Sequence, residues 1–315
     1  MRDHFIARLT EMAERDPRIT LITGDLGFGV LTNFANRFPK QFINVGVAEQ
    51  NMTGLATGLA LEGRIVFTYS IANFVFMRCL EQIRNDAAYH DANVNVVSIG
   101  AGFSYGALGV SHHATEDLAI MRCLPGLTVA SPGDDWEAAE ATEAIANTAG
   151  TCYLRLDKSS AGHTQRPGES FQLGQARVLR EGHDLTLVGT GGILECVLHA
   201  ADALARQGIS CRVLSVHTIQ PLDLETLSRA ADETGGLITI EEHTVHGGLG
   251  GAVAELLMEH GTIPRVFQRM GLRGEFSSVV GSQQFLRQRY EIDADAIVAT
   301  AVRTLARRPP HRLAG

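Results

Sequence analysis

The chain has 315 residues, 45% of them hydrophobic, and carries a formal net charge of −8 at neutral pH. Its length is sufficient for two compact domains, each with a hydrophobic core. The acidic balance argues against nucleic acid as a partner, because binding to phosphate backbones requires a basic protein face. No apolar run approaches the roughly 20 residues that a membrane-spanning helix needs, so we expect no membrane association.

Five cysteines are scattered along the chain without a Cys-x-x-Cys pair. An odd number at irregular spacing predicts neither a disulfide framework nor a structural zinc site. The N-terminus leads directly into an amphipathic segment, with no basic region followed by an apolar one. We therefore expect a cytoplasmic protein in a reducing compartment.

Short apolar segments alternate with longer stretches of small residues in the first half of the chain. This pattern predicts strands at 19–23, 41–44, 64–68, 94–99, 127–130 and 152–156. It predicts helices at 49–61, 71–86 and 134–147. Such an alternation indicates a mainly parallel sheet flanked by helices.

A polar, turn-rich stretch at 161–174 predicts a linker between a first domain, 1–160, and a second, 175–315. The alternation then resumes, with strands expected at 185–189, 211–215 and 237–241 and helices at 193–207, 224–234 and 247–260. The fold class is therefore α/β, with two domains of mainly parallel sheets flanked by helices. The basic tail at 307–312 is expected to fray.

One acidic residue stands out, because Glu49 lies between a predicted strand and a small-residue helix. Its neighbours are mostly apolar, and no Lys or Arg occurs between Lys40 and Arg64. We expect a raised pKa, so that the carboxyl group can hold or share a proton with a bound heteroaromatic ring. The alternative is an ordinary carboxylate stabilised by the dipole of the helix that follows.

Several segments resemble the transketolase family of thiamine-diphosphate enzymes. Residues 42–52, followed by Gly54 and Gly58, are similar to the family's pyrimidine-binding domain, as are 106–122 and 125–129. Segments 182–186, 220–223 and 240–243 are similar to the family's C-terminal domain. The resemblance covers nearly the whole chain. It implies a pyrimidine-binding domain at 1–160 and a transketolase C-terminal domain at 175–315.

The other half of the family's cofactor site is missing from this sequence. That half carries a Gly-Asp-Gly motif and a later Asn, which hold Mg²⁺ on the cofactor's diphosphate, whereas residues 24–27 here read Gly-Asp-Leu-Gly. The resemblance therefore implies a split enzyme, in which an N-terminal subunit supplies the diphosphate and Mg²⁺ site. Thiamine diphosphate would lie between the two subunits, plausibly in a two-plus-two heterotetramer, and this chain would bind no metal itself.

The resemblance also implies which residues contact the cofactor. Glu49 matches the glutamate that bonds the aminopyrimidine ring and activates the cofactor, and Phe74 matches the phenylalanine that stacks on that ring. Ile71 and Met77 take flanking positions that are aromatic in many members. Simple core packing is the alternative role for Phe74.

Two further residues are implied in substrate binding. His112 matches a histidine that faces the substrate's carbonyl and hydroxyl groups, and Lys158 aligns with an arginine that binds a sugar phosphate. The adjacent His113 should point elsewhere, and no third ligand favours a metal at this pair. A solvated lysine at a strand end is the alternative for Lys158.

Two departures and one glycine-rich loop affect the assignment. Leu108 and Gly100 stand where many family members have an aspartate and a histidine that contact substrate, so the substrate is expected to differ from pentose phosphates. The glycines within 247–251 resemble a phosphate-binding loop, but we favour tight packing at a domain or subunit contact.

The function implied is transfer of a two-carbon ketol unit from a ketose or ketose phosphate to an aldehyde. One alternative is the beta subunit of a 2-oxo-acid dehydrogenase, although the segments 111–113 and 117–122 resemble transketolase more. Another alternative is a non-catalytic paralogue that retains the fold and binds a partner.

Overall fold

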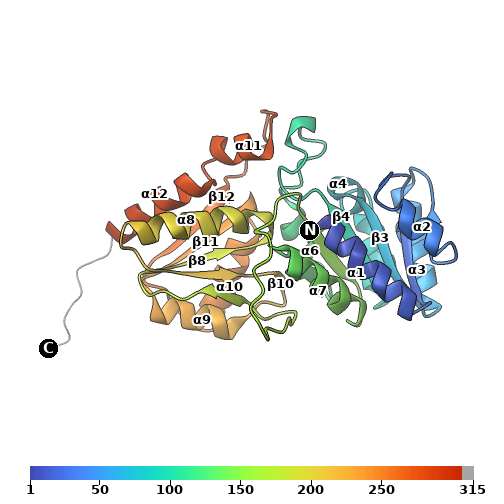
Figure 1. Cartoon of the computed structure of the whole chain (residues 1–315), viewed down its shortest axis with the longest axis horizontal. Coiled ribbons are helices and arrows are strands. Elements are labelled where there is room, and N and C mark those ends of the chain that lie inside the picture. Colours follow the sequence, from blue (N-terminus) through green and yellow to red (C-terminus); the bar gives the residue numbers. More distant parts are fainter. Residues whose placement is uncertain (307–315) are drawn as a thin grey trace.

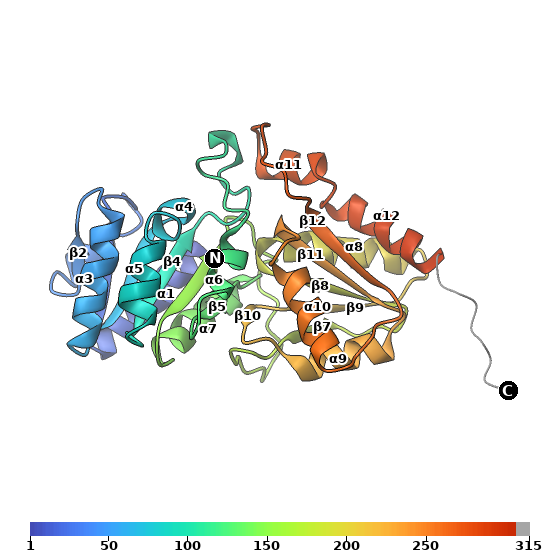
Figure 2. The same cartoon turned by 180° about the vertical axis from the view of Figure 1, so that it is seen from behind.

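The computed structural model describes residues 1–306, so the tail at 307–312 that was expected to fray lies outside the described part. Figure 1 shows two lobes side by side, each a twisted sheet with helices on both faces. Figure 2 shows the same two layers of helices from behind. The predicted class is confirmed: both sheets are mainly parallel.

The sheet of the first lobe has seven strands, in the order β10-β5-β6-β4-β3-β1-β2. Six come from the first half of the chain: β1 (Ile19–Thr23), β2 (Phe42–Asn44), β3 (Ile65–Ile71), β4 (Val94–Ile99), β5 (Thr128–Ala130) and β6 (Cys152–Leu156). The longer helices are α1 (Arg2–Arg15), α2 (Thr32–Arg37), α3 (Glu49–Leu61), α6 (Asp117–Arg122) and α7 (Asp135–Ala146).

Alternate residues of the central strands serve two separate cores, because successive side chains of a strand point to opposite faces. Val66 of β3 packs in the core that contains Met52 of α3. Its neighbour Phe67 packs in the core that contains Phe5 of α1 and Ala138 of α7. The strands are therefore buried on both faces, as expected for parallel sheets.

The second sheet has five strands in the order β12-β11-β8-β9-β7, and only the edge strand β7 runs antiparallel. The strands are β7 (Arg177–Arg180), β8 (Leu185–Gly189), β9 (Cys211–Ser215), β11 (Leu237–Thr244) and β12 (Phe267–Leu272). The flanking helices are α8 (Leu194–Arg206), α9 (Leu224–Glu233), α10 (Leu249–Glu259), α11 (Gln283–Arg289) and α12 (Ala294–Ala306).

The predicted continuous helix at 71–86 is wrong. The strand β3 continues to Ile71, and the chain then forms a single turn, α4 (Ala72–Val75), a turn, α5 (Leu80–Gln82) and a π-helix (Ile83–Ala88). The amide of Asn73 explains the short first turn, since it donates to the backbone carbonyls of Ser111 and His113 at 3.0 and 2.9 Å. This anchoring brings α4 against the loop that carries His112.

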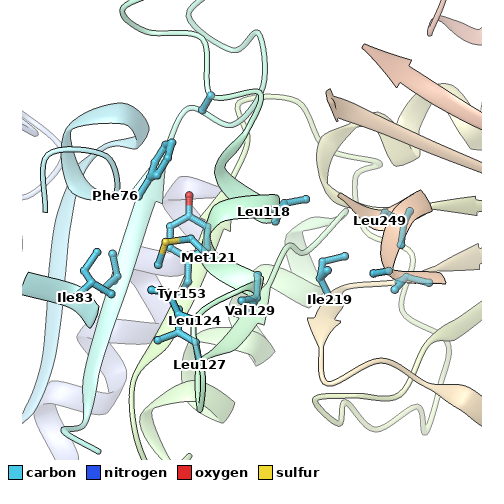
Figure 3. Close-up of a cluster of buried hydrophobic side chains, with 14 of the residues drawn as sticks. Phe76, Ile83, Leu118, Met121, Leu124, Leu127, Val129, Tyr153, Ile219 and Leu249 are labelled. Carbon is cyan, nitrogen blue, oxygen red and sulfur yellow. The ribbon is translucent and has the colours of Figure 1, made fainter. Parts of the chain in front are cut away.

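The two lobes share one hydrophobic core. The short strand β10 (Thr218–Gln220) belongs to the second half of the chain but joins the first sheet, where it pairs antiparallel with β5. Figure 3 shows the resulting row of buried side chains, in which Tyr153 and Val129 continue through Ile219 of β10 to Leu249 of the second lobe. This continuity fixes how the lobes lie relative to each other.

A buried polar network joins the same lobes. Arg155 of β6 is 1% exposed; its Nε lies 2.8 Å from the Asp117 carboxylate, and Nη2 donates to the backbone carbonyl of Glu242 in β11 at 3.1 Å. The Glu242 side chain in turn binds the backbone N–H of Phe103 and the guanidinium of Arg287 in α11. We call Asp117, Arg155, Glu241, Glu242, His243 and Arg287 the interdomain network.

The glycine-rich loop before α10 is filled by this network. The Glu241 carboxylate accepts hydrogen bonds from the backbone N–H groups of Leu249 and Gly250, at 2.7 and 2.9 Å. A Cβ atom on Gly248 would lie 2.0 Å from Oε2 of Glu241, so only glycine fits there. The tight-packing interpretation of this loop is correct, because a carboxylate of the chain itself takes the place of a phosphate.

Candidate active site

Glu49 is the first residue of α3 and lies at the carboxyl-terminal edge of the first sheet. Residues 45–48 turn the chain between β2 and α3, with Gly46 at a φ of +73° that favours glycine. The side chain of Glu49 points inward and the residue is only 5% exposed. The start of a helix is also where its dipole favours a carboxylate, so the position suits a buried acid.

Glu49 has a cationic neighbour that the sequence did not predict. Nη1 of Arg78 lies 3.2 Å from both carboxylate oxygens. The expectation of a carboxylate without a nearby cation is therefore wrong. It was based on residues 40–64, whereas Arg78 reaches Glu49 from the turn after α4, which follows β3 in the chain.

Phe74, in α4, lies beside this ion pair. The guanidinium carbon of Arg78 stands 3.9 Å from the centre of the Phe74 ring, a cation–π contact. The ring of His112 meets the same phenyl ring edge-on, with the two centroids 5.2 Å apart. Phe74 therefore contacts both Arg78 and His112. It is only half-buried, whereas Phe76, two residues later, is fully buried.

His112 is half-buried, and its Nδ1 lies 2.9 Å from the Ser111 hydroxyl. Its pKa is lowered by burial, with smaller contributions from His113 and Arg78. The imidazole is therefore neutral at neutral pH and has one nitrogen to donate a proton and one to accept.

The neighbouring imidazole points away, as predicted. His113 is buried and its Nε2 lies 3.1 Å from the carbonyl oxygen of Gly106. Among residues 1–306 there is no group of three or more His, Cys, Asp or Glu side chains that could hold a metal ion.

Tyr105 extends the row beyond His112. Its ring is centred 6.2 Å from that of His112, and the Lys158 ammonium lies 3.7 Å from its centre on the other side. A Cβ atom on Gly100 would lie 2.1 Å from the Tyr105 ring. Tyr105 therefore fills the space next to the position where many family members have a histidine.

The remaining predicted residues differ in their placement. Met77 lines a cavity of about 320 Å³ together with Phe74, Arg78 and Phe276, whereas Ile71 ends β3 outside this lining. Lys158 lines a neighbouring cavity of about 390 Å³ with Tyr105 and Asp157. The pKa of Lys158 is lowered mainly by burial. Leu108 is 56% exposed at the tip of the loop that carries His112.

The structure thus arranges Glu49, Arg78, Phe74, His112, Tyr105 and Lys158 in one row along the rim of the first lobe. Arg78 and Tyr105 were missed from the sequence. Helical spacing gave no valid signal for Arg78, because Arg78 lies in the turn after α4 and not on one helix with Phe74. Nothing in the sequence around Tyr105 indicated that it would bridge His112 and Lys158.

Comparisons with known proteins agree with this architecture. The chain matches the transketolase pyrimidine binding domain over residues 1–163 and the transketolase C-terminal domain over residues 174–297. It is 38% identical to the 6-deoxy-6-sulfo-D-fructose transketolase subunit of Clostridium sp. (strain MSTE9), with 96% of this chain and 93% of that protein covered. It is 35% identical to an apulose-4-phosphate transketolase subunit of Phocaeicola vulgatus, with 96% of each covered.

A solved structure described as a split gene transketolase, inactive beta4 tetramer, is also similar. It superposes with a TM-score of 0.87 at 35% identity and covers 98% of both chains. The two lobes and these matches together define a two-domain α/β subunit of a group-transfer enzyme. The chain belongs to the transketolase family and acts as a transferase subunit with that family's pyrimidine-binding and C-terminal domains. None of its helices within residues 1–306 has the length and apolar character to cross a membrane.

Membership of this family implies dependence on thiamine diphosphate. The residues present fit the aminopyrimidine part of that cofactor. Glu49 offers a buried carboxylate, and Phe74 offers an aromatic face. The guanidinium of Arg78, which is planar and bears N–H groups, contacts both at once. An aminopyrimidine ring is also planar and bears N–H groups, so it can make the same two contacts.

Proposed function

We propose that the chain catalyses two-carbon ketol transfer from a ketose to an aldehyde, together with a second subunit that completes the site. The observation that supports this most is the row of Glu49, Arg78, Phe74 and His112, in which each side chain contacts the next. Thiamine diphosphate, when bound, supplies the carbon nucleophile that accepts the ketol unit.

The residues of the row have distinct roles in this proposal. The Glu49 carboxylate holds or shares a proton with the ring nitrogen of the aminopyrimidine, and its burial keeps water from competing for that proton. Phe74 orients the ring by stacking, and Met77 covers one side of the same cavity. Ile71 is assigned a place beside the pyrimidine because it directly precedes α4, which carries Phe74.

His112 is assigned to the substrate. Its neutral imidazole can donate a hydrogen bond to the oxygen of the substrate carbonyl as negative charge develops there. Lys158 is assigned to an anionic end of the sugar. The names of the two relatives, which mention a sulfo sugar and a sugar phosphate, are consistent with an anionic substrate at this cavity.

The proposed partner is an N-terminal transketolase subunit that binds the diphosphate and Mg²⁺. The similar solved structure, an inactive tetramer of beta chains, supports the need for a second type of chain, and we propose a two-plus-two assembly. Domain limits at 1–160 and 175–315, with 161–174 as linker, are part of the proposal. The five free cysteines support a cytoplasmic, reducing location.

The direct test is Glu49→Gln in the complex with the proposed N-terminal subunit. We expect ketol transfer to fall by at least about a hundredfold, the usual effect of losing a proton-transfer group, with the melting temperature little changed. Glu62→Gln, at the exposed end of the same helix, is the matched control and should keep full activity. Full activity of the Glu49 variant would refute the assignment.

The same complex distinguishes the dehydrogenase alternative. Assayed with a 2-oxo acid and an electron acceptor, it should show no turnover, whereas a ketose and an aldehyde should react. The opposite pattern would favour the beta subunit of a 2-oxo-acid dehydrogenase, and no turnover with either pair would favour the non-catalytic paralogue.

A further inference from the structure

We propose that Arg78 acts as an internal plug, which occupies the aminopyrimidine position in the free subunit and must leave before cofactor binds. This inference deepens the proposed function and depends on it, since it assumes that Glu49 and Phe74 receive the pyrimidine ring. It assigns Arg78 a role in regulating the site.

The geometry that carries the proposal is the double contact of one guanidinium. Its Nη1 lies 3.2 Å from both oxygens of Glu49, and its central carbon lies 3.9 Å from the centre of the Phe74 ring. A guanidinium is flat and presents N–H groups at its edge, as an aminopyrimidine does once its ring nitrogen carries a proton. With Arg78 in this position, both groups that would bind the ring are already in use.

The two members of the Arg78–Glu49 ion pair differ in their exposure to solvent. Glu49 is nearly buried, so its carboxylate benefits from a partner, whereas the Arg78 side chain is 49% exposed and water screens the pair. Within residues 1–306, Glu49 is the only ionic partner of Arg78 within 4 Å. Arg78 lies in the turn between α4 and α5, so its side chain can swing outward without breaking a strand contact.

Cofactor can bind only to molecules in which Arg78 has left this position. The apparent affinity for cofactor is therefore the intrinsic affinity multiplied by the fraction of such molecules. A half-exposed ion pair and a cation–π contact are each weak, so we expect removal of the guanidinium to tighten binding by roughly three- to tenfold. If Arg78 instead holds Glu49 in position for the cofactor, its removal should weaken binding.

The experiment measures the dissociation constant of thiamine diphosphate with Mg²⁺ by calorimetry, using this chain in complex with its N-terminal subunit. Arg78→Gln should bind three- to tenfold more tightly than wild type. Arg84→Gln is the matched control, because it removes the same charge from an exposed side chain that bonds only Asn85 among residues 1–306. Unchanged or weaker binding by the Arg78 variant, with an unchanged melting temperature, would overturn the proposal.

A second measurement uses the isolated chain and 4-amino-5-hydroxymethyl-2-methylpyrimidine, the ring fragment without its charges. Arg78→Gln should again bind more tightly, and its advantage over wild type should shrink at high salt, because salt screens the competing ion pair. An advantage that does not change with salt would contradict an electrostatic plug.

Failure of the plug and failure of the proposed function give different results. If Glu49→Gln weakens cofactor binding but Arg78→Gln does not strengthen it, the plug is wrong and the cofactor site is right. If neither substitution alters cofactor binding by the complex, the proposed function itself is wrong.

Discussion

The interdomain network and the rim around Glu49 both contain an arginine paired with an acid, yet they differ in exposure. Arg155 and Asp117 are 1% and 0% exposed and bond to both lobes, so every charge meets a partner inside the chain. The Arg78 side chain is 49% exposed, whereas that of its partner Glu49 is 6% exposed. The first pair joins the lobes, whereas the second can be exchanged for an outside ligand.

Both pairs consist of an arginine and an acid, so residue type does not tell them apart. Their exposure to solvent indicates which pair supports the fold and which can serve the active site. A buried pair with no access to solvent fixes the mutual orientation of the lobes, and removal of one partner destabilises the fold because the other charge is left buried alone. A buried carboxylate whose partner is exposed can accept another partner without unfolding the protein. The following predictions test that distinction from the largest expected effect to the smallest.

The largest effect on stability should come from Asp117→Ala. The substitution leaves the Arg155 guanidinium buried without its carboxylate, which typically costs about 3 to 5 kcal/mol. Chemical denaturation measures the loss. Asp202→Ala removes the carboxylate of an exposed pair with Arg180 and should cost less than about 1 kcal/mol. Equal losses for the two variants would contradict the structural role of the buried pair.

The second prediction concerns pH, because burial lowers the pKa of His243 from 6.5 to about 4. Stability from the neutral imidazole is complete above pH 6.5 and is lost as the pH falls through 4. Burial raises the pKa of the adjacent Glu241 to about 7, so its contribution runs the other way, complete below 4.5 and lost as the pH rises through 7.

His243→Gln separates the two groups. The free energy of unfolding of wild type minus that of the variant should increase by roughly 2 to 3 kcal/mol between pH 4 and 6.5. Denaturation curves at a series of pH values measure this difference. If it stays constant over that range, His243 does not titrate as a buried neutral group.

The smallest effect is expected for Phe74, and the fully buried Phe76 two residues later serves as the contrast. Phe74→Ala should raise the dissociation constant of thiamine diphosphate for the complex about tenfold, since a stacked ring is lost, and should change stability little. Phe76→Ala should cost about 3 to 5 kcal/mol of stability because Phe76 is fully buried. Calorimetry measures cofactor binding by both variants, and denaturation measures their stability. If the Phe74 variant is as unstable as the Phe76 variant, Phe74 serves core packing.

The sequence predicted the elements whose local pattern agrees with their tertiary surroundings. The helix expected at 49–61 begins and ends as predicted, and the strand at 152–156 is equally accurate. The helix expected at 71–86 failed because Asn73 bonds a loop almost 40 residues away, which no local pattern reveals.

The candidate site shows the same limit. Glu49, Phe74, His112 and Lys158 were found through family motifs, and the structure brings them into one row. Arg78 and Tyr105 complete that row through contacts between segments far apart in the chain, such as the approach of Tyr105 to Gly100. Sequence reasoning found the motif residues but not the side chains that connect them.

The central claim is that this chain holds half of an active site. The most direct measurement is ketol transfer from a ketose to an aldehyde at fixed chain concentration, with thiamine diphosphate and Mg²⁺ present and the N-terminal subunit titrated in. We predict no transfer without that subunit and a rise that saturates at one partner per chain. Turnover by the isolated chain would contradict the account.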